Sequence, residues 1–184
     1  MQTDAGSLVL VVGPSGAGKD SILRGAAKIL RDNPHFVFPK RVVTRVADVA
    51  AEDHDTLSES SFEAIRTAGG FLLSWQAHGN SYGILAAVAD QMKMGQVVVV
   101  NVSRQIIAEA AIKFPSLVVI EITAEASLRV QRIEQRGREV SKAAAARAMR
   151  EVDAYPSGIA LHSIENNASL DVAILRFVSL LETL

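Results

Sequence analysis

Short apolar runs and amphipathic segments alternate along most of this chain. Runs rich in β-branched residues occur at Ser7–Val12, Val97–Val102 and Leu117–Ile122. Continuous apolar runs of this length are typical of strands buried on both faces of a parallel sheet. A further strand is expected around Leu161–Glu165. The pattern therefore predicts a central parallel β-sheet.

Between these runs, apolar positions recur with helical spacing. The segment Ile106–Phe114 predicts a helix that ends before Pro115, and a last helix is expected from Ser169 onward. A helix is also expected directly after the first strand, with an apolar face made of Ile22, Leu23, Ala26, Ala27 and Leu30. Strands that alternate with helices predict an α/β fold with right-handed crossovers.

Two stretches interrupt this alternation. Arg41–Tyr82 combines polar turns, a short helix expected at about Ser58–Ala68, and mixed strands. Arg136–Tyr155 is charged and rich in alanine. Because substrate-covering parts usually lie outside the central sheet, we expect both stretches to serve the functional site. We find no repeat or linker, and predict a single domain for the 184 residues.

Composition narrows the possible functions. The chain is 49% hydrophobic and 21% charged, with a net charge of -1, which argues against a general nucleic-acid binder. It contains no cysteine, so disulfides, thiolate metal sites and cysteine nucleophiles are excluded. No apolar run approaches the roughly 20 residues needed to span a membrane, and the first residues do not resemble a signal peptide. We therefore expect a cytoplasmic enzyme or binding domain with no membrane partner.

One motif carries specific chemistry. The segment "VVGPSGAGKDS" fits the phosphate-binding pattern G-x-x-x-x-G-K-[ST] except at its last position. Backbone N–H groups of such a loop point at phosphate oxygens, and its lysine reaches the β- and γ-phosphates. A strand before the loop and a helix after it favour ATP binding over a simple glycine-rich turn. The residues expected to contact ATP are Gly13, Pro14, Ser15, Gly16, Ala17, Gly18, Lys19, Asp20 and Ser21.

The last position of the motif is occupied by Asp20 instead of a hydroxyl residue that contacts Mg²⁺. At the end of the strand Val97–Val102, where such enzymes usually carry an aspartate, this chain has Asn101. Our interpretation is that one carboxylate has moved, so that Asp20 binds Mg²⁺ directly or through water, with Asn101 as a weaker candidate. The alternative is that Asp20 is only a favourable charge at a helix N-terminus.

"GPSGAGKDS" and the later "RIEQRGRE" resemble the guanylate kinase group of nucleoside monophosphate kinases. Thr44–Arg45 is similar to that group's acceptor-phosphate clamp, Phe71–Gly83 to its stretch that closes on G-N-Y-Y-G, and Asn166–Leu170 to its loop beside adenine. The resemblance implies a P-loop NTPase fold of nucleoside monophosphate kinase type. Its parts would be a core at about 7–40, 95–130 and 156–184, an acceptor-binding region at about 41–83 and an arginine-bearing lid at about 136–150.

The departures from that group resemble the ribose 1,5-bisphosphate phosphokinases. Leu73 stands where guanylate kinases place a glutamate that reads guanine, and the second clamp arginine has no counterpart. The narrower family is similar in Glu52–His54 (E-x-H), Asn101–Arg104 (N-x-S-R) and Arg136–Glu139 (R-G-R-E). This resemblance implies ATP- and Mg²⁺-dependent phosphorylation of ribose 1,5-bisphosphate to 5-phospho-α-D-ribose 1-diphosphate. A nucleoside monophosphate kinase and a non-catalytic binding module of the same fold remain as alternatives.

The resemblance also implies roles for individual residues. Lys19, Arg136 and Arg138 would stabilise the transferred phosphoryl group, and Asn166 would lie beside the nucleotide. The acceptor would be bound by Thr44, Arg45, Tyr82, Ser103 and Arg104, with Arg41 close by. Most of these acceptor residues have an ordinary alternative: Arg45 as a surface residue, Ser103 and Arg104 as a helix cap, and Tyr82 as a packed ring. His54 is equally well explained as a solvated loop residue, and Trp75 is expected to pack in the core.

Overall fold

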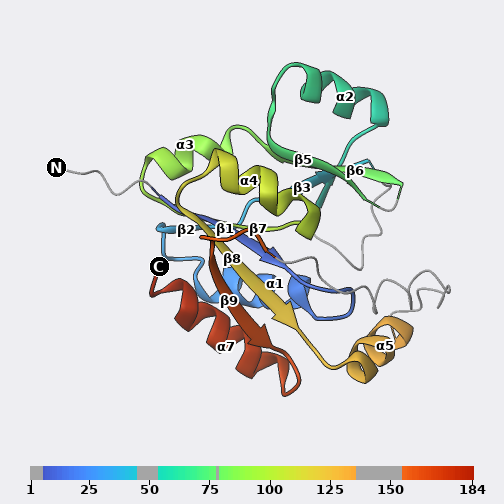
Figure 1. Ribbon diagram of the computed structural model, residues 1–184, viewed down its shortest axis with the longest axis vertical. Helices are drawn as coiled ribbons and strands as arrows, with labels where there is room; N and C mark the ends of the chain where they lie inside the picture. The colour runs from blue at the N-terminus through green and yellow to red at the C-terminus, as the bar shows by residue number, and fades with distance from the viewer. Residues whose placement is uncertain (1–5, 45–53, 78, 136–154) are drawn as a thin grey trace.

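The computed structural model describes residues 6–44, 54–77, 79–135 and 155–184 (Figure 1). Its strands form two sheets. The first contains β1 (Leu8–Val12), β2 (Phe36–Val37), β7 (Val97–Asn101), β8 (Leu117–Thr123) and β9 (Ala160–Glu165). The second contains β3 (Arg41–Val43), β4 (His54–Thr56), β5 (Phe71–Ala77) and β6 (Asn80–Leu85). The helices are α1 (Lys19–Ile29), α2 (Glu59–Thr67), α3 (Val88–Lys93), α4 (Ile107–Lys113), α5 (Ala126–Gln135), α7 (Leu170–Leu181) and the 3₁₀ helix η1 (Arg104–Ile106).

The first sheet is parallel throughout, in the order β2-β7-β1-β8-β9. Helices α1 and α7 cover one face and α3 and α4 cover the other (Figure 1). Alternate residues of β1 point to opposite faces, as the pleat requires. Val9 and Val11 pack with α1 and α7, whereas Leu8, Leu10 and Val12 belong to the cluster on the α4 side. The predicted α/β fold with a central parallel sheet is confirmed.

The second sheet has the order β4-β3-β6-β5 and combines parallel and antiparallel pairs. Leu73, Trp75 and Tyr82 from this sheet belong to the same hydrophobic cluster as Leu10 and Val100 of the first. The two sheets therefore share one hydrophobic core, which fixes the position of the second sheet relative to the first. The predicted packing of Trp75 is confirmed, since it is buried.

Most predicted element boundaries agree closely with the structure. Helix α2 begins after Ser58, whose hydroxyl accepts a hydrogen bond from the Ser61 N–H, and ends at the expected place. Ser169 caps α7 in the same way. The helix predicted from Ile106 instead begins with the 3₁₀ turn η1 and becomes α-helical at Ile107. Elements β2 and α3 are too short to leave a clear pattern in the sequence.

Two predicted regions lie outside the described residues: the lid at about 136–150, and residues 45–53 of the acceptor-binding region, between β3 and β4. Within the described ranges, no helix is both long enough and apolar enough to cross a membrane.

Candidate active site

The phosphate loop joins β1 to α1 and runs close to two other segments. Gly16 has a φ of 81°, and a Cβ placed there would lie 2.6 Å from the carbonyl oxygen of Arg129 in α5. Gly18 has a φ of 95°, and a Cβ there would collide with the side chain of Asn166. Glycine is required at both positions because the backbone is left-handed and the neighbouring atoms leave no space. The loop is therefore held in one shape from two sides.

Lys19 is the first residue of α1, and its side chain folds back over the loop. Its Nζ donates hydrogen bonds to the carbonyl oxygens of Gly13 and Pro14, at 2.8 and 3.1 Å. The ammonium group is thus held at the mouth of the phosphate loop. This is the position from which a phosphate-loop lysine reaches β- and γ-phosphates.

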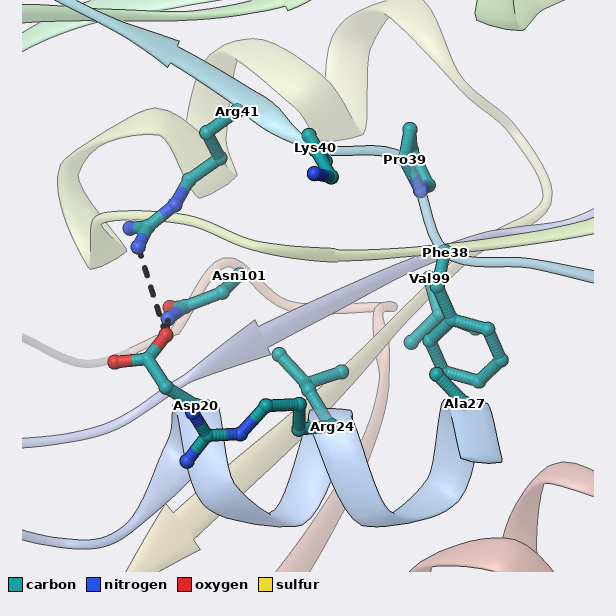
Figure 2. A pocket seen from close by; sticks show the side chains of 10 residues that line it. Asp20, Arg24, Ala27, Phe38, Pro39, Lys40, Arg41, Val99 and Asn101 are labelled. Atoms are coloured by element: carbon teal, nitrogen blue, oxygen red, sulfur yellow. Dashed lines mark hydrogen bonds and ion pairs between the residues drawn. The ribbon is translucent and has the colours of Figure 1, made fainter. Parts of the chain in front are cut away.

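Asp20 and Asn101 meet beside this loop. The Asn101 side-chain amide donates a 2.7 Å hydrogen bond to Oδ1 of Asp20, although the two residues lie 81 positions apart in sequence. The Arg41 guanidinium approaches the same oxygen at 3.5 Å. Figure 2 shows the three side chains converging from α1, β7 and the start of β3. The sequence analysis interpreted Asp20 as carrying the carboxylate that is missing at Asn101, and the two residues are in direct contact.

The donor set near Asp20 fits a magnesium-bound nucleotide better than a metal held by protein alone. Among the described residues, no three His, Cys, Asp or Glu side chains are grouped as a metal site. Mg²⁺ in nucleotide sites needs only one or two carboxylates, because phosphates and water supply its remaining ligands. Asp20 retains 30% exposure of its side chain next to the loop. Asp20 can therefore contribute the carboxylate, with Asn101 beside it.

A cavity of about 120 Å³ opens next to Asp20 (Figure 2). It lies between α1 and the segment that connects β2 to β3. Arg24, Lys40 and Arg41 give it three cationic side chains, and Phe38 gives it an apolar wall. This arrangement suits an anionic ligand. Of the three cations, only Arg41 came from the sequence analysis, because the others depend on how α1 faces the β2–β3 connection.

The predicted acceptor residues Thr44 and Tyr82 make contacts within the second sheet. The Thr44 hydroxyl accepts a 2.9 Å hydrogen bond from the Ser81 N–H, which joins the ends of β3 and β6. Tyr82 is buried, with its ring stacked on Trp75 at 5.5 Å between centroids. The Arg41 guanidinium lies 5.9 Å from the centre of the Tyr82 ring. Tyr82 is therefore a packed ring that also supports a cation; a contact with acceptor stays a prediction.

Arg104 is held by a partner that the sequence analysis missed. Its Nη2 forms a 3.0 Å ion pair with Oε1 of Glu121, which lies in β8. Burial raises the pKa of the nearby Tyr155 hydroxyl, and the Glu121 carboxylate raises it further. Within the described residues, the Ser103 side chain makes no capping bond to η1, so the capping alternative does not hold for it. Arg104, Glu121 and Tyr155 thus bring together η1, β8 and the first residue described after 136–154.

Asn166 is buried against the phosphate loop. Its side chain is only 2% exposed, and its Nδ2 donates a 2.8 Å hydrogen bond to the Ala17 carbonyl. Its backbone carbonyl oxygen accepts a 3.0 Å hydrogen bond from Arg132. That Asn166 lies beside the bound nucleotide stays a prediction. In the structure Asn166 supports the phosphate loop and connects it to α5.

His54 requires a correction. The sequence analysis allowed a solvated loop histidine, but His54 begins strand β4 and is only 9% exposed. Six other residues named in the sequence analysis lie outside the described part of the chain. They are Arg45, Glu52, Asp53, Arg136, Arg138 and Glu139.

The sequence and the fold match known proteins. A family model described as guanylate kinase matches residues 5–183. A ribose 1,5-bisphosphate phosphokinase of Methylobacterium radiotolerans is 44% identical over 175 residues, which cover 95% of this chain and 96% of the relative. The crystal structure of a guanylate kinase from Anaplasma phagocytophilum aligns with a TM-score of 0.68 at 18% identity, covering 100% of this chain and 88% of the other. That likeness shows the fold.

Longer relatives also match. A bifunctional ribose 1,5-bisphosphokinase-thymidine phosphorylase of Azorhizobium caulinodans is 40% identical over 177 residues, or 96% of this chain, but the match covers only 26% of the relative. This chain thus spans about a quarter of the length of that bifunctional protein. The family model and the full-length match agree with the phosphate loop and the parallel sheet described above. The chain therefore belongs to the guanylate kinase family and, within it, to the family of ribose 1,5-bisphosphate phosphokinases.

Proposed function

We propose that this protein uses ATP to phosphorylate the 1-phosphate of ribose 1,5-bisphosphate. The observation that carries the proposal is the cavity beside Asp20, which three cations line. Such a cavity favours an acceptor rich in phosphate. At the position where guanylate kinases place a base-reading glutamate, Leu73 is only 1% exposed and offers no hydrogen-bond acceptor in its side chain. Relatives named ribose 1,5-bisphosphate phosphokinase support the same choice of acceptor.

The reaction is an in-line phosphoryl transfer. An oxygen of the acceptor's 1-phosphate forms a bond to the γ-phosphorus of ATP, the bond from that phosphorus to the β–γ bridging oxygen breaks, and ADP leaves. The products are ADP and 5-phospho-α-D-ribose 1-diphosphate. The attacking phosphate is already ionised at neutral pH, so no side chain has to remove a proton.

The protein's contribution is alignment and charge. The phosphate loop orients the β- and γ-phosphates through its backbone N–H groups, and Lys19 places an ammonium group at the loop mouth. Bound Mg²⁺ would neutralise charge on the transferred group, with Asp20 as its protein ligand and Asn101 beside it. Arg136 and Arg138 stay predicted lid residues that cover this group. Thr44, Arg45, Tyr82, Ser103 and Arg104 stay predicted residues of the acceptor side.

The role of Asp20 can be tested by comparing the wild type with Asp20→Ala and Asp20→Ser. We expect Asp20→Ala to bind ATP but to lose about a hundredfold or more of Mg²⁺-dependent transfer, because the carboxylate that holds the ion is gone. Asp20→Ser restores the hydroxyl of the ordinary motif and should retain more activity than alanine. Product analysis with ribose 1,5-bisphosphate measures this. Wild-type transfer rates in Asp20→Ala would exclude the metal role.

The acceptor can be tested on the wild type alone. Ribose 1,5-bisphosphate, GMP, AMP, CMP and UMP are each supplied with MgATP, and ADP formation is followed. We expect turnover of the sugar bisphosphate to exceed that of every nucleotide. Faster turnover of GMP would instead identify a nucleoside monophosphate kinase. Absence of any turnover, together with no thermal stabilisation by ATP, would indicate a non-catalytic module.

A further inference from the structure

His54 is a buried histidine whose ring nitrogens lack hydrogen bonds to the rest of the described structure. It is 9% exposed, and neither Nδ1 nor Nε2 finds a hydrogen-bond partner within the described part of the chain. A neutral imidazole always carries one N–H donor and one acceptor nitrogen. Leaving both buried without partners costs folding free energy, so such a group in a folded protein requires an explanation.

Strand pairing places His54 next to a cation. In the parallel ladder between β3 and β4, His54 is the direct partner of Arg41. Direct partners on adjacent strands project from the same face of a sheet. On that face the Arg41 guanidinium extends to Asp20 (Figure 2), and it also lies over the Tyr82 ring. Arg41 and His54 are therefore neighbours on the face of the second sheet that is directed toward the phosphate loop. Arg41 supplies a cation, and His54 supplies an N–H that has no acceptor among the described residues.

Arg41 lies between Asp20, which is beside the phosphate loop, and His54 of the second sheet. Its side chain is 14% exposed, lines the cavity beside Asp20, and approaches Asp20 at 3.5 Å, which is long for a charge-assisted bond. Asn101 contacts the same carboxylate oxygen at 2.7 Å. A divalent cation bound by Asp20 repels a guanidinium placed on the same oxygen. Binding of the metal therefore favours a different anionic partner for Arg41.

We propose that Arg41 and His54 form an anion site that binds a phosphate group of the acceptor, and that Arg41 exchanges Asp20 for this phosphate when MgATP is bound. The proposal rests on the proposed function for the identity of the acceptor. Arg41 supplies a planar pair of donors, which matches two phosphate oxygens. His54 supplies a single N–H to a third oxygen. The same phosphate thus satisfies a donor that has no partner among the described residues.

The His54 half is tested with His54→Phe and His54→Gln. Phenylalanine replaces the imidazole with a planar aromatic ring that has no nitrogens, so we expect the melting temperature to stay equal or rise, while KM for ribose 1,5-bisphosphate rises about tenfold. Glutamine keeps an N–H donor and should raise KM less. The exposed His35, changed to Gln, serves as the matched control and should leave KM unchanged. A KM within twofold of wild type in a folded His54→Phe protein would overturn the role of His54.

The Arg41 half is tested with Arg41→Met and Arg41→Lys. We expect methionine to raise KM for the acceptor about a hundredfold and lysine about tenfold, because lysine keeps the charge but not the paired donors. Titration calorimetry with Mg²⁺ and a non-hydrolysable ATP analogue should give Arg41→Met an affinity equal to or tighter than wild type, since a competitor of the metal is removed. Weaker analogue binding with an unchanged acceptor KM would overturn the exchange.

These outcomes are separable from the proposed function. If the wild type does not phosphorylate ribose 1,5-bisphosphate, the proposed function fails before any variant is measured. If the wild type does so and all four variants keep its KM, only the Arg41–His54 site fails.

Discussion

The phosphate-loop region and the second sheet satisfy their polar side chains in different ways. Near the loop, Lys19 bonds to loop carbonyls, Asn101 to Asp20, and Asn166 Nδ2 to Ala17, although Asn166 Oδ1 has no partner in the described chain. On the second sheet, His54 is buried without a hydrogen-bond partner in the described chain. The loop region is therefore organised before any ligand arrives, whereas the second sheet contains a donor that a ligand could satisfy.

This difference has a thermodynamic consequence. A preformed phosphate site loses little conformational entropy when ATP binds. A site with an unsatisfied buried donor instead lowers the stability of the free protein and recovers that free energy when an anion is bound. The first region thus favours affinity for a common nucleotide, and the second favours discrimination among acceptors, because only a ligand with an oxygen at the right place satisfies His54.

The largest expected effect comes from Lys19→Met in the loop region. Methionine keeps most of the length of the side chain but removes the ammonium group at the loop mouth. We expect the rate of phosphoryl transfer to fall about a thousandfold, because a preorganised charge near the transferred group is lost. Single-turnover measurements with saturating MgATP and acceptor would test this expectation.

The same variant also tests the separation of the two regions. Acceptor binding to Lys19→Met, measured by titration calorimetry, should stay within about threefold of wild type. Strong loss of acceptor affinity would mean that the two regions do not bind their ligands independently.

A smaller effect is expected from two glycines that share a left-handed backbone but differ in surroundings. Gly79, in the turn between β5 and β6, has a φ of 73° and open space where a Cβ would lie, whereas a Cβ on Gly16 meets the Arg129 carbonyl. We expect Gly79→Ala to cost about 1 kcal/mol of unfolding free energy from backbone strain alone. Gly16→Ala should cost about 3 kcal/mol, since α5 must also move.

Urea unfolding measures both substitutions under the same conditions. ATP affinity provides a second measurement, because Gly16→Ala should weaken it and Gly79→Ala should not. Equal costs for the two variants would mean that α5 yields easily, and that the loop is less constrained than the packing of Gly16 indicates.

Sequence reasoning was most successful where the chemistry is contiguous. The phosphate loop occupies residues 13–21 of one strand–turn–helix unit, so its spacing alone located the backbone that curls around phosphate. The sequence also pointed to Asp20 and Asn101 as parts of one site, because the carboxyl ends of parallel strands meet the loop at one edge of the sheet. Continuous apolar runs identified β1, β7 and β8 for the same reason: both faces of these strands are buried.

The remainder depends on register and on packing between distant segments. Arg41 and His54 become neighbours only through the pairing of β3 with β4, which the intervening sequence does not determine by any local pattern. The ion pair of Arg104 with Glu121 likewise joins two distant segments, the 3₁₀ helix η1 and strand β8. The resemblance placed Asn166 beside the nucleotide, but it did not reveal that the buried side chain bonds to the Ala17 carbonyl. Residue type alone does not distinguish a ligand contact from support of the loop.

The smallest expected effect concerns Tyr155, which lies outside both regions. Burial, followed by the Glu121 carboxylate, raises the pKa of its hydroxyl above the ordinary value of 10.0. Below about pH 10 the tyrosine is protonated in both the folded and the unfolded chain, so it adds no pH dependence there. Above that pH the unfolded chain releases the proton while the folded chain retains it, and the free energy of unfolding falls as pH rises.

Tyr155→Phe removes this contribution without changing the ring. We expect the wild type to lose stability relative to the variant above pH 10, by at most about 1.4 kcal/mol per pH unit, and to show no such divergence between pH 7 and 9. Denaturant unfolding at a series of pH values gives the two curves. Parallel curves through pH 11 would mean that the hydroxyl ionises equally easily in the folded chain, and that the Arg104–Glu121 pair does not enclose it. Because neither ATP nor acceptor is needed, this measurement tests the packing behind the site independently of both ligand-binding regions.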